Sequence, residues 1–173
     1  MKPLFKVPLI YGAVAGMVGS ALVIALYYLN RHPFLIPVFF DFRIILFAIF
    51  IFFTLKELRE FHYGGILYFW QGLIASFTFT AIFALIAAVV IGVFATIVPG
   101  FLSSYIQLSI EQLKALPETV VSQIGKDVFA RNLEMLPSTN VLDLATLYFW
   151  QSFMISFFIS VILSVILRRQ PKI

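Results

Sequence analysis

The sequence contains no cysteine and few charged residues, since Asp, Glu, Lys and Arg make up 12% of its 173 residues. The absence of cysteine excludes disulfides, thiolate metal sites, iron–sulfur clusters and cysteine nucleophiles. The two histidines, His32 and His62, fall in different loops and cannot share a metal ion. The chain also lacks a phosphate-binding glycine loop and a plausible catalytic triad. We therefore expect no enzyme activity, no cofactor and no metal site.

Apolar residues are abundant instead. They form 62% of the chain, with 21 phenylalanines and a mean hydropathy of +1.04. A soluble domain is about 45–50% apolar and about 25% charged. A chain this short cannot bury such an excess in one core, so we expect the lipid bilayer to surround it. The net charge of +4 is not concentrated in a basic run, and we expect no nucleic-acid partner.

Four stretches are long and apolar enough to cross a bilayer, which takes about 20 residues. They are 7–29, 37–55, 66–98 and 141–167. The third is longer than a bilayer needs, so the helix must tilt or leave one end in the interface. The predicted fold is therefore all-α, a single membrane domain of residues 1–173 with four spanning helices.

The segment 101–140 is the only sizeable polar part of the chain. Its apolar residues recur at helical spacing on both sides of Pro117. We expect two short amphipathic helices, 101–116 and 118–136. Three placements stay open: on the outer leaflet, over the helix bundle, or against a partner.

Positive charge near the helix ends predicts the orientation, because Lys and Arg are enriched in short cytoplasmic loops. With both termini in the cytoplasm, the cytoplasmic side carries seven such residues. These are Lys2, Lys6, Lys56, Arg59, Arg168, Arg169 and Lys172. We therefore expect both termini on the cytoplasmic side.

The pentapeptide LYFWQ occurs twice, at 67–71 and 147–151. Tyr and Trp favour the membrane–water boundary, so Tyr68, Trp70, Tyr148 and Trp150 are predicted to form interface belts at opposite membrane surfaces. Two origins of the repeat stay open: an inverted duplication of the transporter type, or convergence on an aromatic belt followed by a groove of small residues.

Small residues recur at every fourth position in three of the four predicted spans. Such spacing lets helices approach closely in lipid, where no hydrophobic force drives them together. These residues are Gly12, Gly16 and Ser20; Gly72, Ser76, Thr80, Ala84, Ala88 and Gly92; and Ser152, Ser156, Ser160 and Ser164. We expect tight contacts among the first, third and fourth helices, and a second helix turned more to lipid or a partner. The serines either pack or line a polar path, and the glycine pair of the first helix also favours self-association.

Three ionisable residues near the outer ends of the second and fourth spans are candidates for a function, because charge in a membrane is costly. Arg43 is a candidate for an ion pair with either Asp41 or Asp143. Structural roles are the alternative, with Arg43 reaching to the interface and Asp143 capping its helix beside Asn140.

The run from Lys56 to Gln71, K-x-L-R-x-x-x-x-G-G-x-L-x-F-x-Q, is a more specific pattern, and the chain ends in a dibasic segment. With the order of the spans, it resembles the bacterial inner-membrane family labelled domain of unknown function 4199. The resemblance implies four helices, the bacterial inner membrane and no established catalytic residues. It also points to a partner enzyme of the lipid-carrier glycosyltransferase type.

Two functions follow as expectations. The first is an accessory or structural membrane subunit that holds or regulates a membrane-associated enzyme. The second is a small transporter or a lipid-handling protein, which would need a polar cavity near the midplane.

Overall fold

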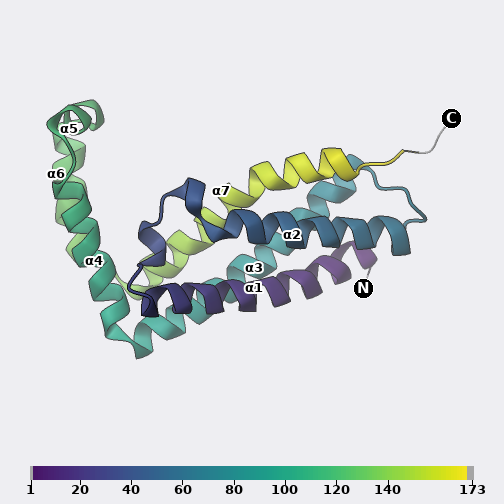
Figure 1. Cartoon of the computed structure of the whole chain (residues 1–173), viewed down its shortest axis with the longest axis horizontal. Helices are drawn as coiled ribbons and strands as arrows, with labels where there is room; N and C mark the ends of the chain where they lie inside the picture. Colours follow the sequence, from purple (N-terminus) through teal and green to yellow (C-terminus); the bar gives the residue numbers. More distant parts are fainter. Residues whose placement is uncertain (1, 171–173) are drawn as a thin grey trace.

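The computed structural model describes residues 2–170, which form helices joined by turns and one isolated β-bridge between Leu67 and Arg169 (Figure 1). Lys172, one of the predicted cytoplasmic residues, lies outside the described residues. The helices are α1 (Pro3–Tyr28), α2 (Phe42–Glu57), α3 (Phe69–Ile97), α4 (Pro99–Lys114), α5 (Glu118–Ile124), α6 (Lys126–Met135) and α7 (Val141–Leu167). Shorter turns are η1 (Pro33–Leu35), η2 (Val38–Phe40), the π-helical η3 (Leu58–His62) and η4 (Leu136–Ser138).

Helices α1, α2, α3 and α7 form an antiparallel bundle in which successive helices alternate in direction (Figure 1). Helix α3 lies between α1 and α7 and packs on both, while α2 closes the opposite side. The start of α1 and the end of α7 lie at one end of the bundle, which we call the terminal end. Helix α4 leaves from the other end, which we call the arm end.

Three helices, α1, α3 and α7, are long and apolar enough to cross a membrane. They correspond to the predicted spans 7–29, 66–98 and 141–167, with α7 matching its predicted range at both ends. The predicted all-α fold is therefore confirmed, and these helices are those of a membrane protein.

Helix α2 differs from the predicted span 37–55 and has 16 residues. The chain first passes through η1 and η2, each next to a proline. The carboxylate of Asp41 then accepts a hydrogen bond from the backbone N–H of Arg43 at 2.9 Å and starts the helix at Phe42. The lengths of the α-helices therefore support three spanning helices. Helix α2 continues directly into the π-helical turn η3.

The segment predicted as two amphipathic helices contains three, α4, α5 and α6, which we call the arm (99–135). The second predicted helix is divided at Gly125, whose φ of +96° no α-helix accommodates. Figure 1 shows α4 leading away from the bundle at a steep angle to its axis and α6 leading back toward α7. No residue of α5 or α6 is fully buried.

Close backbone contact holds α1 against α3. A Cβ atom at Gly12 would lie 2.7 Å from the carbonyl oxygen of Phe79, and one at Gly16 would lie 3.2 Å from that of Phe83. The aromatic rings of Phe79 and Phe83 are fully buried, and Phe47 of α2 meets the Phe83 ring edge-on at 4.7 Å between centroids. Small residues and aromatic rings thus interlock in the centre of the bundle.

Candidate functional site

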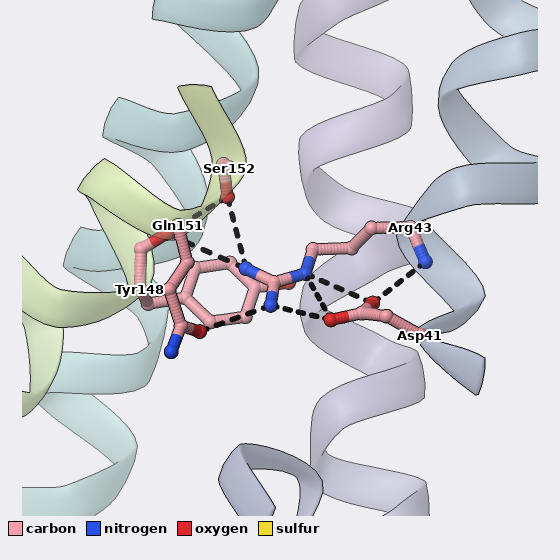
Figure 2. Close-up of polar contacts among 5 residues, drawn as sticks. All are labelled: Asp41, Arg43, Tyr148, Gln151 and Ser152. Carbon is pink, nitrogen blue, oxygen red and sulfur yellow. Dashed lines mark hydrogen bonds and ion pairs between the residues drawn. The ribbon is translucent and has the colours of Figure 1, made fainter. Parts of the chain in front are cut away.

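The most elaborate polar group in the bundle centres on Arg43, which is 4% exposed at the start of α2 (Figure 2). Its Nε–H donates to both carboxylate oxygens of Asp41, at 3.0 and 2.9 Å, and its Nη2 donates to Oδ2 of the same carboxylate. Asp41 is itself buried. The two side chains therefore form an ion pair with the fork geometry that an arginine and a carboxylate favour.

Helix α7 supplies the other half of the cluster. Arg43 donates from Nη1 to Ser152 Oγ at 3.2 Å and from Nη2 to Gln151 Oε1 at 3.1 Å. Its guanidinium carbon also lies 4.3 Å from the centroid of the Tyr148 ring, within range of a cation–π contact. Figure 2 shows the arginine reaching from α2 to these three side chains, which share one face of α7 because they stand three and four residues apart.

We call this arrangement the arginine clamp, because Arg43 connects the start of α2 to α7. The carboxylate of Asp41, just before α2, neutralises the guanidinium, and acceptors on α7 occupy its other donors. An arginine stays protonated at any physiological pH, so it cannot shuttle a proton. The cluster therefore joins α2 to α7 and fixes their register.

Asp143 lies outside this cluster, so an ion pair between Arg43 and Asp143 does not form. Its carboxylate accepts from the backbone N–H of Asn140 at 2.9 Å, and the Asn140 side chain accepts from the N–H of Asp143 at 3.1 Å. This reciprocal capping box starts α7, where a carboxylate also favours the positive end of the helix dipole. Asp143 is exposed.

The predicted small residues lie in two seams. Gly12, Gly16 and Ser20 of α1 are buried, the two glycines against α3. The seam between α3 and α7 holds Gly72, whose Cβ would meet Ser164, and Thr80, whose hydroxyl is hydrogen-bonded to that of Ser156. The remaining buried members are Ser76, Ala84, Ser152 and Ser160.

Two of the predicted helix-packing residues lie outside these two seams. Ala88 and Gly92 border a surface groove of about 700 Å³ between α3 and α7 at the arm end. A Cβ atom at Gly92 would meet only Ala145, at 3.9 Å. The two helices diverge here, so the small residues open a groove instead of closing a seam.

The four serines of α7 have no exposed surface. Ser152 donates to the carbonyl oxygen of Tyr148 at 2.8 Å, and the hydroxyls of Ser156 and Ser160 lie 3.2 Å apart. The serine face is closed, with Ser152 against Arg43 of α2 and Ser156 and Ser164 against α3. This geometry is that of a helix contact, which counts against a polar path along these serines.

The interface belt prediction is wrong for Tyr148. Tyr68, Trp70 and Trp150 are exposed on the outside of the molecule, whereas Tyr148 is 2% exposed and covers Arg43. The glutamines of the two LYFWQ copies are also used differently. Gln71 accepts from the backbone N–H of Tyr68 at 3.0 Å to start α3, whereas Gln151 binds Arg43.

The two histidines lie at opposite ends of the bundle. His62 is exposed in η3, 3.8 Å from Glu57. His32 is buried among aromatic rings at the arm end, with Phe101 the nearest at 4.9 Å between centroids. Its Nε2 donates to the Phe101 carbonyl oxygen at 3.1 Å. Burial lowers the pKa of His32 from its usual value, and the Phe101 carbonyl offsets part of this shift.

Sequence reasoning missed the α7 half of the cluster and the burial of His32. The spacing of Tyr148, Gln151 and Ser152 carried a signal, since a polar face on an apolar helix requires partners inside the protein. For His32 the sequence held no comparable pattern, because its aromatic neighbours come from three separate elements.

Fold and site together define an all-helical membrane-protein bundle with a buried arginine clamp. The chain belongs to the family described as a protein of unknown function (DUF4199), whose model matches residues 10–169. The resemblance noted from the Lys56–Gln71 run is thereby confirmed. No curated protein and no solved structure matches the chain.

Proposed function

We propose that the chain is a non-enzymatic subunit of the bacterial inner membrane that binds a membrane-associated partner enzyme. The observation that carries this proposal is the contrast between a closed bundle and an arm that presents apolar side chains. The buried charged residues of the bundle, Asp41 and Arg43, have a structural use, and the arm offers a surface to a partner.

Four spans with both termini in the cytoplasm fit this role. The continuous helical segment 42–62 extends roughly 30 Å, the thickness of the hydrocarbon core. The four bundle helices alternate in direction, which brings the start of α1 and the end of α7 to one side. That side carries Lys6, Lys56, Arg59 and Arg168, and cytoplasmic loops are rich in such residues.

The arm supports contact with a partner. Leu108, Ile124, Val128 and Met135 are between 38% and 60% exposed. Because α4 stands at a steep angle to the bundle axis, the arm runs along the membrane surface when the bundle crosses the bilayer. Apolar side chains in this position meet either the lipid interface or a protein docked there.

The family resemblance favours a partner that handles lipid-linked sugars. Such an enzyme works at the membrane surface, where the arm would meet it.

Self-association is the second contact we propose for the chain. It would use the groove that Ala88 and Gly92 border, since Gly12 and Gly16 are occupied by α3.

A lipid-handling function is the second candidate, and one observation favours it: a cavity below the arm with both polar and apolar walls. A transporter is less well supported, because the serine seam is closed.

Affinity purification from native membranes in mild detergent tests the main proposal. We expect one membrane enzyme in fixed ratio with the full chain, and its loss in the double variant Val128→Asp/Met135→Asp. Glu134→Gln, also on α6, is the matched control and should retain the enzyme. Purification of the chain alone, or equal recovery with both variants, would contradict the proposal.

The topology has a separate test, because a chain without cysteine accepts single reporter cysteines. We expect Gln123→Cys in the arm to react with a membrane-impermeant maleimide in intact spheroplasts, and Lys6→Cys to react only after lysis. The reverse pattern would place the termini outside.

A further inference from the structure

A cavity of about 570 Å³ lies at the arm end of the bundle, between the last turn of α1, the loop 31–42 and helix α4. Leu26, Ile36, Phe40 and Leu108 form apolar parts of its wall. Arg31 and Gln112 add polar groups from the loop and from α4. The cavity wall therefore combines apolar and polar groups, as a binding site for an amphiphile does.

Arg31 is the charged residue of the cavity wall, and it forms no ion pair within residues 2–170. The acidic residues nearby are engaged elsewhere. Asp41 binds Arg43, and Glu111 accepts a hydrogen bond from Gln107 at 3.1 Å. Arg31 is an exposed residue of the cavity wall whose charge no described carboxylate neutralises, so it is available to an anion.

His32 also lines this cavity, and its second ring nitrogen is an acceptor, which takes a donor such as water or a hydroxyl group and not a phosphate oxygen. Its Nε2–H is engaged by the Phe101 carbonyl, which leaves Nδ1 unprotonated and buried without a partner among the described residues. The side chain is more than nine-tenths buried. A buried polar atom without a partner is uncommon in a folded protein and indicates a missing water or ligand.

We propose that this cavity binds the headgroup of an anionic phospholipid from the leaflet at the arm end. Arg31 and Gln112 hold the phosphate, and the acyl chains follow the apolar wall formed by Leu26, Ile36 and Phe40. A lipid bound here would fill the space between bundle and arm. The proposal concerns a lipid site and does not depend on the identity of a protein partner.

Native mass spectrometry of the full chain in mild detergent tests this inference, with phosphatidylglycerol and phosphatidylcholine as the two probes. We expect the wild-type protein to retain phosphatidylglycerol in preference to phosphatidylcholine. In Arg31→Gln, phosphatidylglycerol should bind roughly tenfold more weakly, because a charge-assisted hydrogen bond is lost. Leu108→Trp, which fills the cavity, should reduce the retention of both lipids.

Arg131→Gln is the matched control, since this exposed arginine lies on α6 and does not line the cavity. It should bind phosphatidylglycerol like the wild type. Equal weakening by Arg31→Gln and Arg131→Gln would overturn the proposal in favour of unspecific charge attraction. Displacement of the lipid by millimolar inorganic phosphate would also overturn it, in favour of a free-phosphate site. Circular dichroism spectra of the variants should match the wild type, and undiminished lipid preference in a folded Arg31→Gln protein would refute the assignment.

Discussion

The bundle and the outer arm helices α5 and α6 differ in how they place their polar side chains, whereas α4 buries Ser109 as the bundle buries its serines. In the bundle, Thr54, Thr80 and Ser156 are fully buried and hydrogen-bonded. In the arm, Ser103 and Ser122 are exposed, and all residues of α5 and α6 are exposed or half-buried. Apolar side chains show the converse pattern, because the bundle has bulky residues on its outside as well as in its core.

The proposed placement, with the bundle across the bilayer and the arm at its surface, gives this difference a physical reason. Hydrocarbon offers no hydrogen bonds, so a spanning bundle must satisfy its polar groups internally and hold its helices by close packing. At the membrane surface water satisfies polar groups, and an amphipathic helix needs only one apolar face. Substitutions that disturb internal contacts should therefore affect the bundle far more than the arm.

The largest effect is expected from Arg43→Met. This change leaves the buried Asp41 carboxylate without its partner, and loss of one member of a buried ion pair lowers the free energy of unfolding by about 3–5 kcal/mol. Unfolding with sodium dodecyl sulfate in mixed micelles, followed by circular dichroism, measures the change.

The double variant Asp41→Asn/Arg43→Met tests the cause, because it removes both charges and should recover part of the loss. Asp143→Asn is the control at an exposed carboxylate and should change stability by less than about 1 kcal/mol. If Asp143→Asn were as damaging as Arg43→Met, burial of the clamp would not explain the effect.

Two glycine substitutions compare a closed seam with an open groove. In Gly12→Ala, the new Cβ would lie 2.7 Å from the Phe79 carbonyl oxygen. The helices must separate, which should destabilise the bundle by about 1–3 kcal/mol. In Gly92→Ala, the Cβ would make only an ordinary contact at 3.9 Å, so the higher helix propensity of alanine should stabilise by about 0.5–1 kcal/mol. The same micelle unfolding assay measures both, and equal signs would contradict the distinction between the closed seam at Gly12 and the open groove at Gly92.

The long elements were predictable from the sequence, and the reasons are physical. An apolar run of membrane length has few alternatives to a helix, so α1, α3 and α7 lie where hydropathy placed them. The predictions failed where a single residue determines the start or the end of a helix. Asp41 delays the start of α2 by capping it, and Gly125 divides one expected amphipathic helix into two.

The candidate site was only half visible in the sequence. Charge in a membrane span identified Asp41 and Arg43. The sequence left two ion pairs open for Arg43, one with Asp41 and one with Asp143, and the structure forms the pair with Asp41. The structure pairs Arg43 with Tyr148, Gln151 and Ser152, and the choice depends on how α2 is rotated against α7. Periodicity within one helix does not determine that rotation.

Gly125→Ala should affect only the arm. Its backbone has a φ of +96°, a region that residues with a Cβ rarely adopt. We expect strain of about 1 kcal/mol, relieved by rearrangement of α5 and α6. Limited proteolysis should cut the arm faster, while micelle unfolding of the bundle stays unchanged. Ser122→Ala, at a neighbouring exposed position, is the control. A shift in bundle unfolding with Gly125→Ala would show that arm and bundle fold as one unit.

The smallest effect is expected from pH, at the contact between arm and bundle. Burial lowers the pKa of His32 from its usual 6.5, so the ring is neutral in the folded protein at neutral pH. As the pH falls below about 6.5, the unfolded chain takes up a proton that the folded chain does not, and stability decreases until the pH reaches the folded pKa. Thermal unfolding at pH 7.5 and 5.5 should show this decrease in the wild type and in His62→Asn, and a smaller one in His32→Asn. An unchanged pH dependence in His32→Asn would mean that His32 is not responsible.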